Sequence, residues 1–247
     1  MAAEASHPHE AHEAHEAHEV ASPPELHVLD PSAQRPSWVL WWRPFFAPTL
    51  SDRLLAALVD EHSFEQKHIV LFGREVLQPR LIAWAGDVAY RYSGSTLEAR
   101  PWSTTLAWLR AVVSRAICAA LTDAGVDAAA PSFNHALLNY YADGLASMGA
   151  HSDDEAELGP EPCIASLSFG ATRRFLVRPK RAATRQRSLG FDLAHGELFV
   201  MGGAMQHEYK HALPKTKEAV GPRLNITLRG VRAPIASSSA ARGHRRA

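Results

Sequence analysis

A histidine and an aspartate, His151 and Asp153, stand two residues apart in the stretch GAHSDDE at residues 149–155. Side chains alternate between the two faces of an extended segment, so both would point the same way. One imidazole and one carboxylate are two of the three ligands in the facial triad that holds non-haem Fe(II). A solvated acidic loop would carry the same pair, so the interpretation depends on a third ligand elsewhere in the chain.

The third ligand would be a histidine that arrives from a later strand. His195 lies in a turn, and His244 lies in a basic tail. The stretch MQHEYKHALPK carries His207 and His211, four residues apart, and both remain open on physical grounds. His211 is the more firmly placed of the two, because Pro214 and an apolar pair follow it.

Polar and apolar residues alternate in the stretch GPRLNITLRG at residues 221–230, directly after these histidines. The polar positions are Arg223, Asn225, Thr227 and Arg229. Two guanidinium groups that face the inside of a barrel are costly to bury unless they meet anions. A small dicarboxylate would satisfy both through forked hydrogen bonds. The alternative is an edge strand with a solvated polar face.

Helices and strands must position these residues. Apolar periodicity predicts amphipathic helices over 49–64 and 103–125, and a hairpin over 68–80 that turns near Gly73. Five short strands then follow: FNHALLNYY, CIASLSFG, RRFLVR, ELFVMGG and RLNITLRG. Two helices followed by a run of strands predict an α+β fold, in which the helices pack on one sheet of a sandwich or jelly roll.

We expect one domain over residues 37–233, with disordered tails over 1–36 and 234–247. The first tail contains the repeat HEAHEAHEAHE, for which a metal-binding role is the alternative. This tail contains seven acidic residues and one basic residue, Arg35, which leaves 25 basic and 19 acidic residues in the rest of the chain. This excess of positive charge permits a polyanionic partner.

The two cysteines, Cys118 and Cys163, give neither a disulfide framework nor a zinc-binding spacing. No apolar run approaches the length of a membrane span, and the N-terminus lacks a signal-peptide core. We therefore expect a soluble intracellular monomer with no membrane partner, in the nucleus of a eukaryote or the cytoplasm of a bacterium.

The order H-x-D, then His, then R-x-N-x-T-x-R resembles the AlkB family of Fe(II)- and 2-oxoglutarate-dependent dioxygenases. The motifs that carry the likeness are LLNYYADG, MGAHSDDE, IASLSFGATRRF, MQHEYKHALPK, GPRLNITLR and, upstream, LFGREVLQPRLIAWAGD and YRYSGSTLEARPW. They cover about residues 68–230 and are most similar to the branch that repairs alkylated bases in duplex DNA. The resemblance implies a double-stranded β-helix core with a nucleotide-recognition hairpin region.

The same resemblance implies roles for individual residues. Fe(II) would be bound by His151, Asp153 and His211, because the family's second histidine precedes a proline by three residues, as His211 does. The co-substrate 2-oxoglutarate would be bound by Asn139, Tyr141, Arg223, Asn225, Thr227 and Arg229. The damaged base would be contacted by Phe72, Gly73, Arg74, Tyr90, Tyr92, Ser93, Asp154 and Glu155.

Within this substrate set, Phe72 would fill the gap that a flipped base leaves in the duplex. Asp154 and Glu155 would accept hydrogen bonds from an exocyclic amine. Ala85 follows Trp84 where relatives usually carry an aromatic residue, which bears on substrate preference. The basic run RRFLVRPKRAATRQR at 173–187 is either a solvated loop or a contact for phosphates.

The activity that the resemblance implies is oxidative demethylation of 1-methyladenine and 3-methylcytosine in DNA. It would consume Fe(II)-activated O₂ and 2-oxoglutarate and release succinate, CO₂ and formaldehyde. The target base would have to leave the stack to be reached. The alternatives are the same chemistry on RNA or single strands, and a non-catalytic relative that binds nucleic acid.

Overall fold

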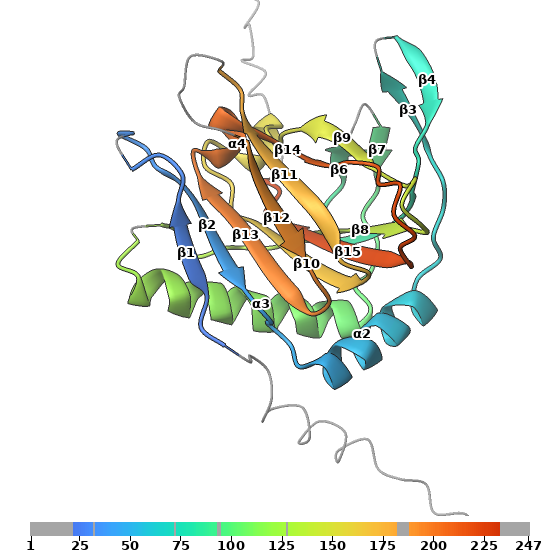
Figure 1. The fold of residues 1–247 in the computed structure, drawn as a ribbon, viewed down its shortest axis with the longest axis horizontal. Coiled ribbons are helices and arrows are strands. Elements are labelled where there is room, and N and C mark those ends of the chain that lie inside the picture. Colours follow the sequence, from blue (N-terminus) through green and yellow to red (C-terminus); the bar gives the residue numbers. More distant parts are fainter. Residues whose placement is uncertain are drawn as a thin grey trace, which may run out of the picture.

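Two antiparallel sheets face each other in the computed structural model, which describes residues 22–31, 33–71, 73–92, 95–126, 128–181 and 188–232 (Figure 1). The major sheet has seven strands in the order β1 (Glu25–Val28), β2 (Ser37–Trp42), β13 (Glu197–Gly203), β10 (Ile164–Gly170), β15 (Arg223–Arg229), β8 (His135–Tyr141) and β5 (Leu81–Gly86). The minor sheet has four strands in the order β12 (Leu189–Leu193), β11 (Arg173–Pro179), β14 (Tyr209–Leu213) and β9 (Met148–His151). The predicted α+β jelly roll is confirmed.

Two hairpins and four helical segments complete the described chain. The hairpins are β3 (His68–Leu71) with β4 (Arg74–Leu77), and β6 (Tyr90–Tyr92) with β7 (Ser95–Leu97). The helices are α2 (Pro48–Asp60), α3 (Thr104–Asp123), the 3-10 turn η1 (Ala156–Leu158) and α4 (Met205–Glu208). The β3–β4 hairpin, predicted over 68–80, projects from the body of the molecule (Figure 1).

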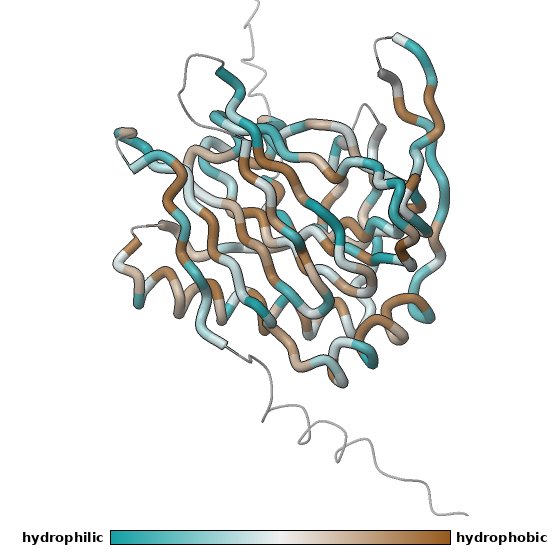
Figure 2. The backbone as a smooth tube through the Cα atoms, viewed as in Figure 1, coloured by the Kyte–Doolittle hydropathy of each residue, from teal (hydrophilic) through white to brown (hydrophobic). Residues whose placement is uncertain are grey.

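The two long helices cover the outer face of the major sheet (Figure 1). The hydroxyl of Ser103 accepts a hydrogen bond from the Leu106 N–H and so begins α3, and Gly125 follows its end with a positive φ of 62°. Leucines and valines of α3 pack on the alternating apolar residues of the sheet, which appear as brown stretches in Figure 2. Both predicted helices are therefore confirmed, with α2 ending at Asp60 rather than at residue 64.

The inner faces of the two sheets enclose a second core, and strand β15 gives it a polar centre. Leu224, Ile226 and Leu228 of β15 point to the helices, whereas its four polar side chains point between the sheets and are buried. The strand alternates as predicted, but it is a central strand between β10 and β8. The alternative of an edge strand with a solvated face is therefore wrong.

Three expectations require correction. Residues 25–28 form strand β1 on the edge of the major sheet, so the predicted disordered tail over 1–36 extends too far. Besides the predicted hairpin, strands β1 and β2 precede the helices and β5–β7 lie between them, where no further strands were expected. Strands β2 and β5 are apolar on both faces and show no alternation that would have marked them. Finally, α3 is long and apolar enough to cross a membrane by length and composition, although here one of its faces packs on the sheet.

Candidate metal centre and co-substrate pocket

Three side chains, His151, Asp153 and His211, converge between the two sheets. Their potential ligand atoms all lie within 4.8 Å of one another. His151 of β9 and His211 of β14 are direct partners across the minor sheet, and their ring centroids are 4.2 Å apart. Antiparallel pairing thus brings the later histidine to the H-x-D pair, 60 positions further along the chain.

The atoms of the triad are arranged to receive a cation. The carbonyl of Gly149 accepts a hydrogen bond from Nδ1 of His151 at 3.0 Å, so this nitrogen carries the proton and Nε2 keeps its lone pair. Oδ1 of Asp153 accepts from Nη2 of Arg229 at 2.9 Å, whereas its buried Oδ2 has no partner among the described residues. Two imidazoles and one free carboxylate oxygen fit the ligand set of non-haem Fe(II).

The surroundings also keep the triad in the protonation state that binds a metal. Burial lowers the pKa of His151, and burial together with His151 lowers the pKa of His211 to about 3. Burial alone would raise the pKa of Asp153, but Arg229 and the two imidazoles outweigh it and hold that pKa at about 2. At neutral pH the site therefore offers two neutral imidazoles and one carboxylate.

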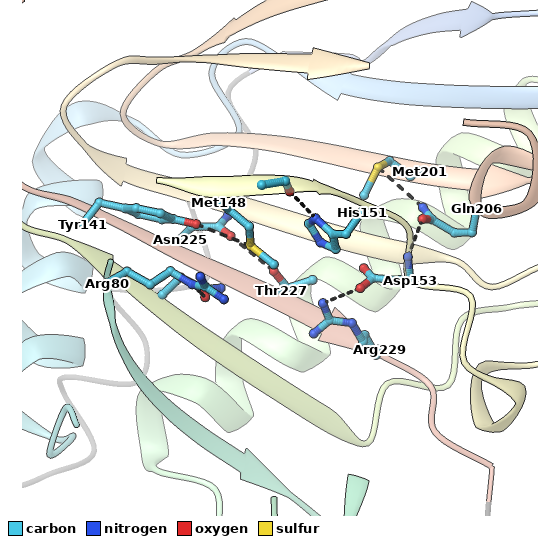
Figure 3. A network of polar contacts seen from close by, with 12 residues as sticks. Arg80, Tyr141, Met148, His151, Asp153, Met201, Gln206, Asn225, Thr227 and Arg229 are labelled. Atoms are coloured by element: carbon cyan, nitrogen blue, oxygen red, sulfur yellow. Dashed lines mark hydrogen bonds and ion pairs between the residues drawn. The ribbon is translucent and has the colours of Figure 1, made fainter. Parts of the chain in front are cut away.

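Gln206 supports the metal centre from α4. Its Oε1 accepts a hydrogen bond from the Asp153 N–H at 2.9 Å, and its Nε2 donates to the sulfur of Met201 at 3.6 Å (Figure 3). The Ser152 hydroxyl donates to the Tyr209 carbonyl at 2.8 Å and ties the same loop to β14. Sequence reasoning missed Gln206, because its role depends on a contact between residues 53 positions apart.

The alternative third ligand, His207, lies outside the centre. It is exposed on α4, and its Nε2 bonds to the carbonyl of Pro160. His211 instead is buried, and its ring stacks on that of Phe175 with the two ring centroids 5.5 Å apart. The geometry favours His211, because its side chain faces inward from β14, whereas His207 is exposed on α4.

A pocket opens beside the triad and contains the predicted co-substrate residues. Its lining includes Asn139, Tyr141, Arg223, Asn225, Thr227 and Arg229 together with the triad. Met148, Ser166, Phe175, Met201, Ala212 and Leu213 complete the wall. Polar groups therefore come from β8 and β15, and apolar groups come mainly from the facing minor sheet.

The two arginines of β15 have different hydrogen-bond partners. Nη2 of Arg223 donates to the Ser168 hydroxyl at 2.9 Å, and its buried Nε has no partner among the described residues. Burial lowers the pKa of Arg223 to about 10, so it stays cationic at neutral pH. Arg229 is bonded to Asp153 (Figure 3). Arg223 thus has a donor available to an anionic ligand, whereas Arg229 is paired with the carboxylate of Asp153.

Other polar residues fix the walls of the pocket. Asn225 donates to the Ser166 hydroxyl and to the Leu167 carbonyl, both at 2.8 Å, and accepts from the Thr227 hydroxyl at 3.2 Å. Asn139 accepts a hydrogen bond at 2.7 Å from Nε of Arg80, a buried residue just before β5. Sequence reasoning did not identify Arg80, because nothing in the segment LQPR distinguishes it from a surface arginine.

The substrate-side residues fall into two groups. Tyr90 is buried, its ring centroid lies 4.9 Å from that of His135, and burial raises its pKa. Glu155 lies beside Tyr90, and burial followed by the charge of Asp153 raises the pKa of Glu155. Asp154 instead pairs with Lys180 at 2.9 Å. The two acids expected to act together therefore face different partners.

The remaining substrate predictions are only partly covered. Phe72 and Ser93 lie outside the described residues, as does the side chain of Tyr92. Gly73 occupies the hairpin turn with a positive φ of 75°, and Arg74 begins β4 with an exposed side chain. The roles of Phe72, Tyr92 and Ser93 stay predictions.

Comparisons with known proteins agree with this geometry. Residues 39–229 match the family described as the 2OG-Fe(II) oxygenase superfamily. The "Alpha-ketoglutarate-dependent dioxygenase alkB homolog 3" of Mus musculus is 38% identical over 161 residues, which cover 62% of this chain and 52% of the relative. The "DNA oxidative demethylase ALKBH2" of Homo sapiens is 36% identical over 170 residues, which cover 66% and 60%. The chain thus spans about half to three-fifths of the length of these relatives.

Among solved structures, one described as "The structure of OsALKBH1" superposes with a TM-score of 0.55 at 15% identity. The superposition covers 77% of this chain and 96% of that one. At this level of identity, the likeness supports the fold alone.

Proposed function

The chain belongs to the 2OG-Fe(II) oxygenase superfamily and, within it, to the AlkB family, and we propose that it is an oxidative demethylase of alkylated bases in DNA. One observation carries the proposal: the same pocket is lined by a His-Asp-His triad and by a buried arginine, Arg223, whose Nε has no partner among the described residues. The name of one relative, "DNA oxidative demethylase ALKBH2", supports DNA as the substrate.

His151, Asp153 and His211 would hold Fe(II). When bound, iron with 2-oxoglutarate and O₂ supplies the hydroxylation of a methyl group on nitrogen, and succinate, CO₂ and formaldehyde are released. The protein contributes fixed ligands. Arg229 holds Oδ1 of Asp153, so that Oδ2 stays directed into the site, and Gln206 holds the backbone of the same residue.

Arg223 would bind a carboxylate of 2-oxoglutarate. Its Nη2 is already oriented by the Ser168 hydroxyl, so little side-chain entropy is lost when an anion binds. The Arg80 guanidinium orients the Asn139 amide on the neighbouring strand, and Asn139 and Tyr141 would donate or accept the remaining hydrogen bonds. The apolar minor-sheet wall excludes water from this end of the pocket.

Tyr90 and Glu155 would read the flipped base. A half-buried carboxylate beside a tyrosine can accept a hydrogen bond from an exocyclic amine, a group shared by adenine and cytosine. This pattern supports 1-methyladenine and 3-methylcytosine as substrates. Because Lys180 neutralises Asp154, we assign the reading of the amine to Glu155 rather than to Asp154. The action on DNA would take place inside the cell, in the nucleus of a eukaryote or the cytoplasm of a bacterium.

Methylated oligonucleotides test the proposal. Single- and double-stranded DNA and RNA carrying one 1-methyladenine would be incubated with enzyme, Fe(II) and 2-oxoglutarate, and the base mass and succinate would be measured. His211→Ala is expected to abolish both products, whereas the matched control His207→Ala retains them, since His207 bonds to Pro160 outside the centre. Equal losses in both variants would contradict the assignment of His211 as the third ligand. Turnover of RNA alone would mean that RNA, rather than DNA, is the substrate.

A further inference from the structure

Two basic side chains face each other on the outer surface of the minor sheet. Arg178 of β11 and Lys210 of β14 are direct partners in the antiparallel register, and both are exposed. The adjacent pair, Val177 and His211, points inward and is buried. Like charges directly opposite each other on neighbouring strands stand about 5 Å apart at Cβ and repel. An anion bound between them would remove this repulsion.

Neither of these two cations is neutralised within the part of the chain that the structure describes. Arg174 lies on the same strand and the same face as Arg178, and it is paired with Asp192 at 2.8 Å. No corresponding ion pair involves Arg178 or Lys210 among the described residues. On the outer face of the minor sheet, Arg174 thus has a counter-ion, whereas Arg178 and Lys210 have none among the described residues.

The facing pair lies close in the chain to Lys180, which contacts Asp154, one of the residues predicted to bind the base. Lys180 lies two residues after Arg178, about 7 Å along an extended chain. Its ammonium donates to Oδ2 of Asp154 at 2.9 Å and to the Gln206 carbonyl at 2.8 Å. Asp154 directly follows the metal ligand Asp153. A nucleic-acid strand whose target base enters the pocket would therefore pass close to Arg178 and Lys210.

We propose that Arg178 and Lys210 form a phosphate-binding site on the outer face of the minor sheet, which holds the backbone beside the flipped nucleotide. The ligand, a nucleic-acid strand, rests on the proposed function. A guanidinium takes two phosphate oxygens in a fork, and an ammonium adds a compact charge. Contacts to phosphate carry no sequence information, so the site adds affinity equally for all sequences.

The test is the salt dependence of binding. Affinity of the full chain for a labelled single-stranded 15-mer with one 1-methyladenine would be measured by fluorescence anisotropy over a series of KCl concentrations. Each lost phosphate contact makes the negative slope of log K against log salt shallower by about 0.7 for single strands. The double variant Arg178→Ala/Lys210→Ala is therefore expected to reduce the magnitude of the slope by about 1.4. The matched control Arg174→Ala leaves the slope unchanged, because Asp192 already neutralises that charge.

Thermal unfolding provides a second readout. Each single variant, Arg178→Ala and Lys210→Ala, is expected to melt no lower than the unchanged protein in low salt, because it removes a repulsion. An unchanged salt slope in the double variant, a slope lowered equally by Arg174→Ala, or a lower melting temperature in both single variants would overturn the site. Binding is measured without turnover, so the salt slope can be interpreted even if demethylation fails. A failure of demethylation would contradict the proposed function alone.

Discussion

Replacing the buried His135 with phenylalanine is expected to stabilise the protein. His135 begins β8, is 0% exposed, and neither of its ring nitrogens has a partner among the described residues. A buried polar group without a hydrogen bond costs about 1–3 kcal/mol, and an apolar ring of similar shape removes that cost. Gly86 leaves the space for the ring, since a Cβ there would lie 2.9 Å from Cδ2 of His135.

The gain should also depend on pH, because burial, followed by the charge of Arg229, lowers the pKa of His135 to about 3. The unfolded chain binds a proton at this position below pH 6.5, whereas the folded chain does so only near pH 3. The stability associated with neutral His135 is therefore complete above pH 6.5 and is lost as the pH falls towards 3. The loss is about 1.4 kcal/mol per pH unit, or about 2 kcal/mol between pH 6.5 and 5.

Urea unfolding of the unchanged protein and of His135→Phe at pH 7.5, 6 and 5 measures both effects. At pH 7.5 the variant is expected to be more stable by about 1–3 kcal/mol, and its advantage should grow by about 2 kcal/mol at pH 5. A variant that is less stable at pH 7.5 would mean that the nitrogens are satisfied in solution. An advantage that does not change with pH would refute the assigned protonation.

Three further predictions concern the site and its frame. Gln206→Leu removes the acceptor for the Asp153 N–H, so Co(II) affinity measured by absorbance titration should fall about 10- to 100-fold; unchanged affinity would remove Gln206 from the site. Arg223→Lys keeps the charge but loses the fork, so the 2-oxoglutarate KM should rise at least tenfold while Co(II) affinity stays constant; equal changes in both would contradict separate roles. Gly202→Ala places a Cβ 2.0 Å from the Trp38 ring, so the melting temperature should fall by several degrees. An unchanged melting temperature would mean that Trp38 can move away.

Much of the site could be predicted from spacing, because alternation along a strand is a local property. The H-x-D pair and the polar face of β15 both follow from the two-residue period of a strand. The choice between His207 and His211 was not local. It depends on the pairing of β9 with β14, and sequence reasoning settled it only through the family resemblance.

What sequence reasoning missed depends on tertiary contact. Strand β2, SWVLWW, is buried along its whole length and so shows no alternation to mark it. Arg80 and Gln206 act through partners 59 and 53 positions away. Asp154 and Glu155 carry equivalent carboxylates in the sequence, and the positions of Lys180 and Tyr90 separate their roles.

Strand β14 places consecutive residues on opposite sides of the minor sheet, with the buried His211 inside and the exposed Lys210 outside. A shift of one residue in the pairing of a strand exchanges its two faces. Inserting or deleting a single residue ahead of His211 would thus turn the imidazole to solvent and force an ammonium among aromatic rings. The length of this segment should tolerate less change than its composition, and an irregularity between His211 and Leu213 already marks where its pairing with β9 is adjusted.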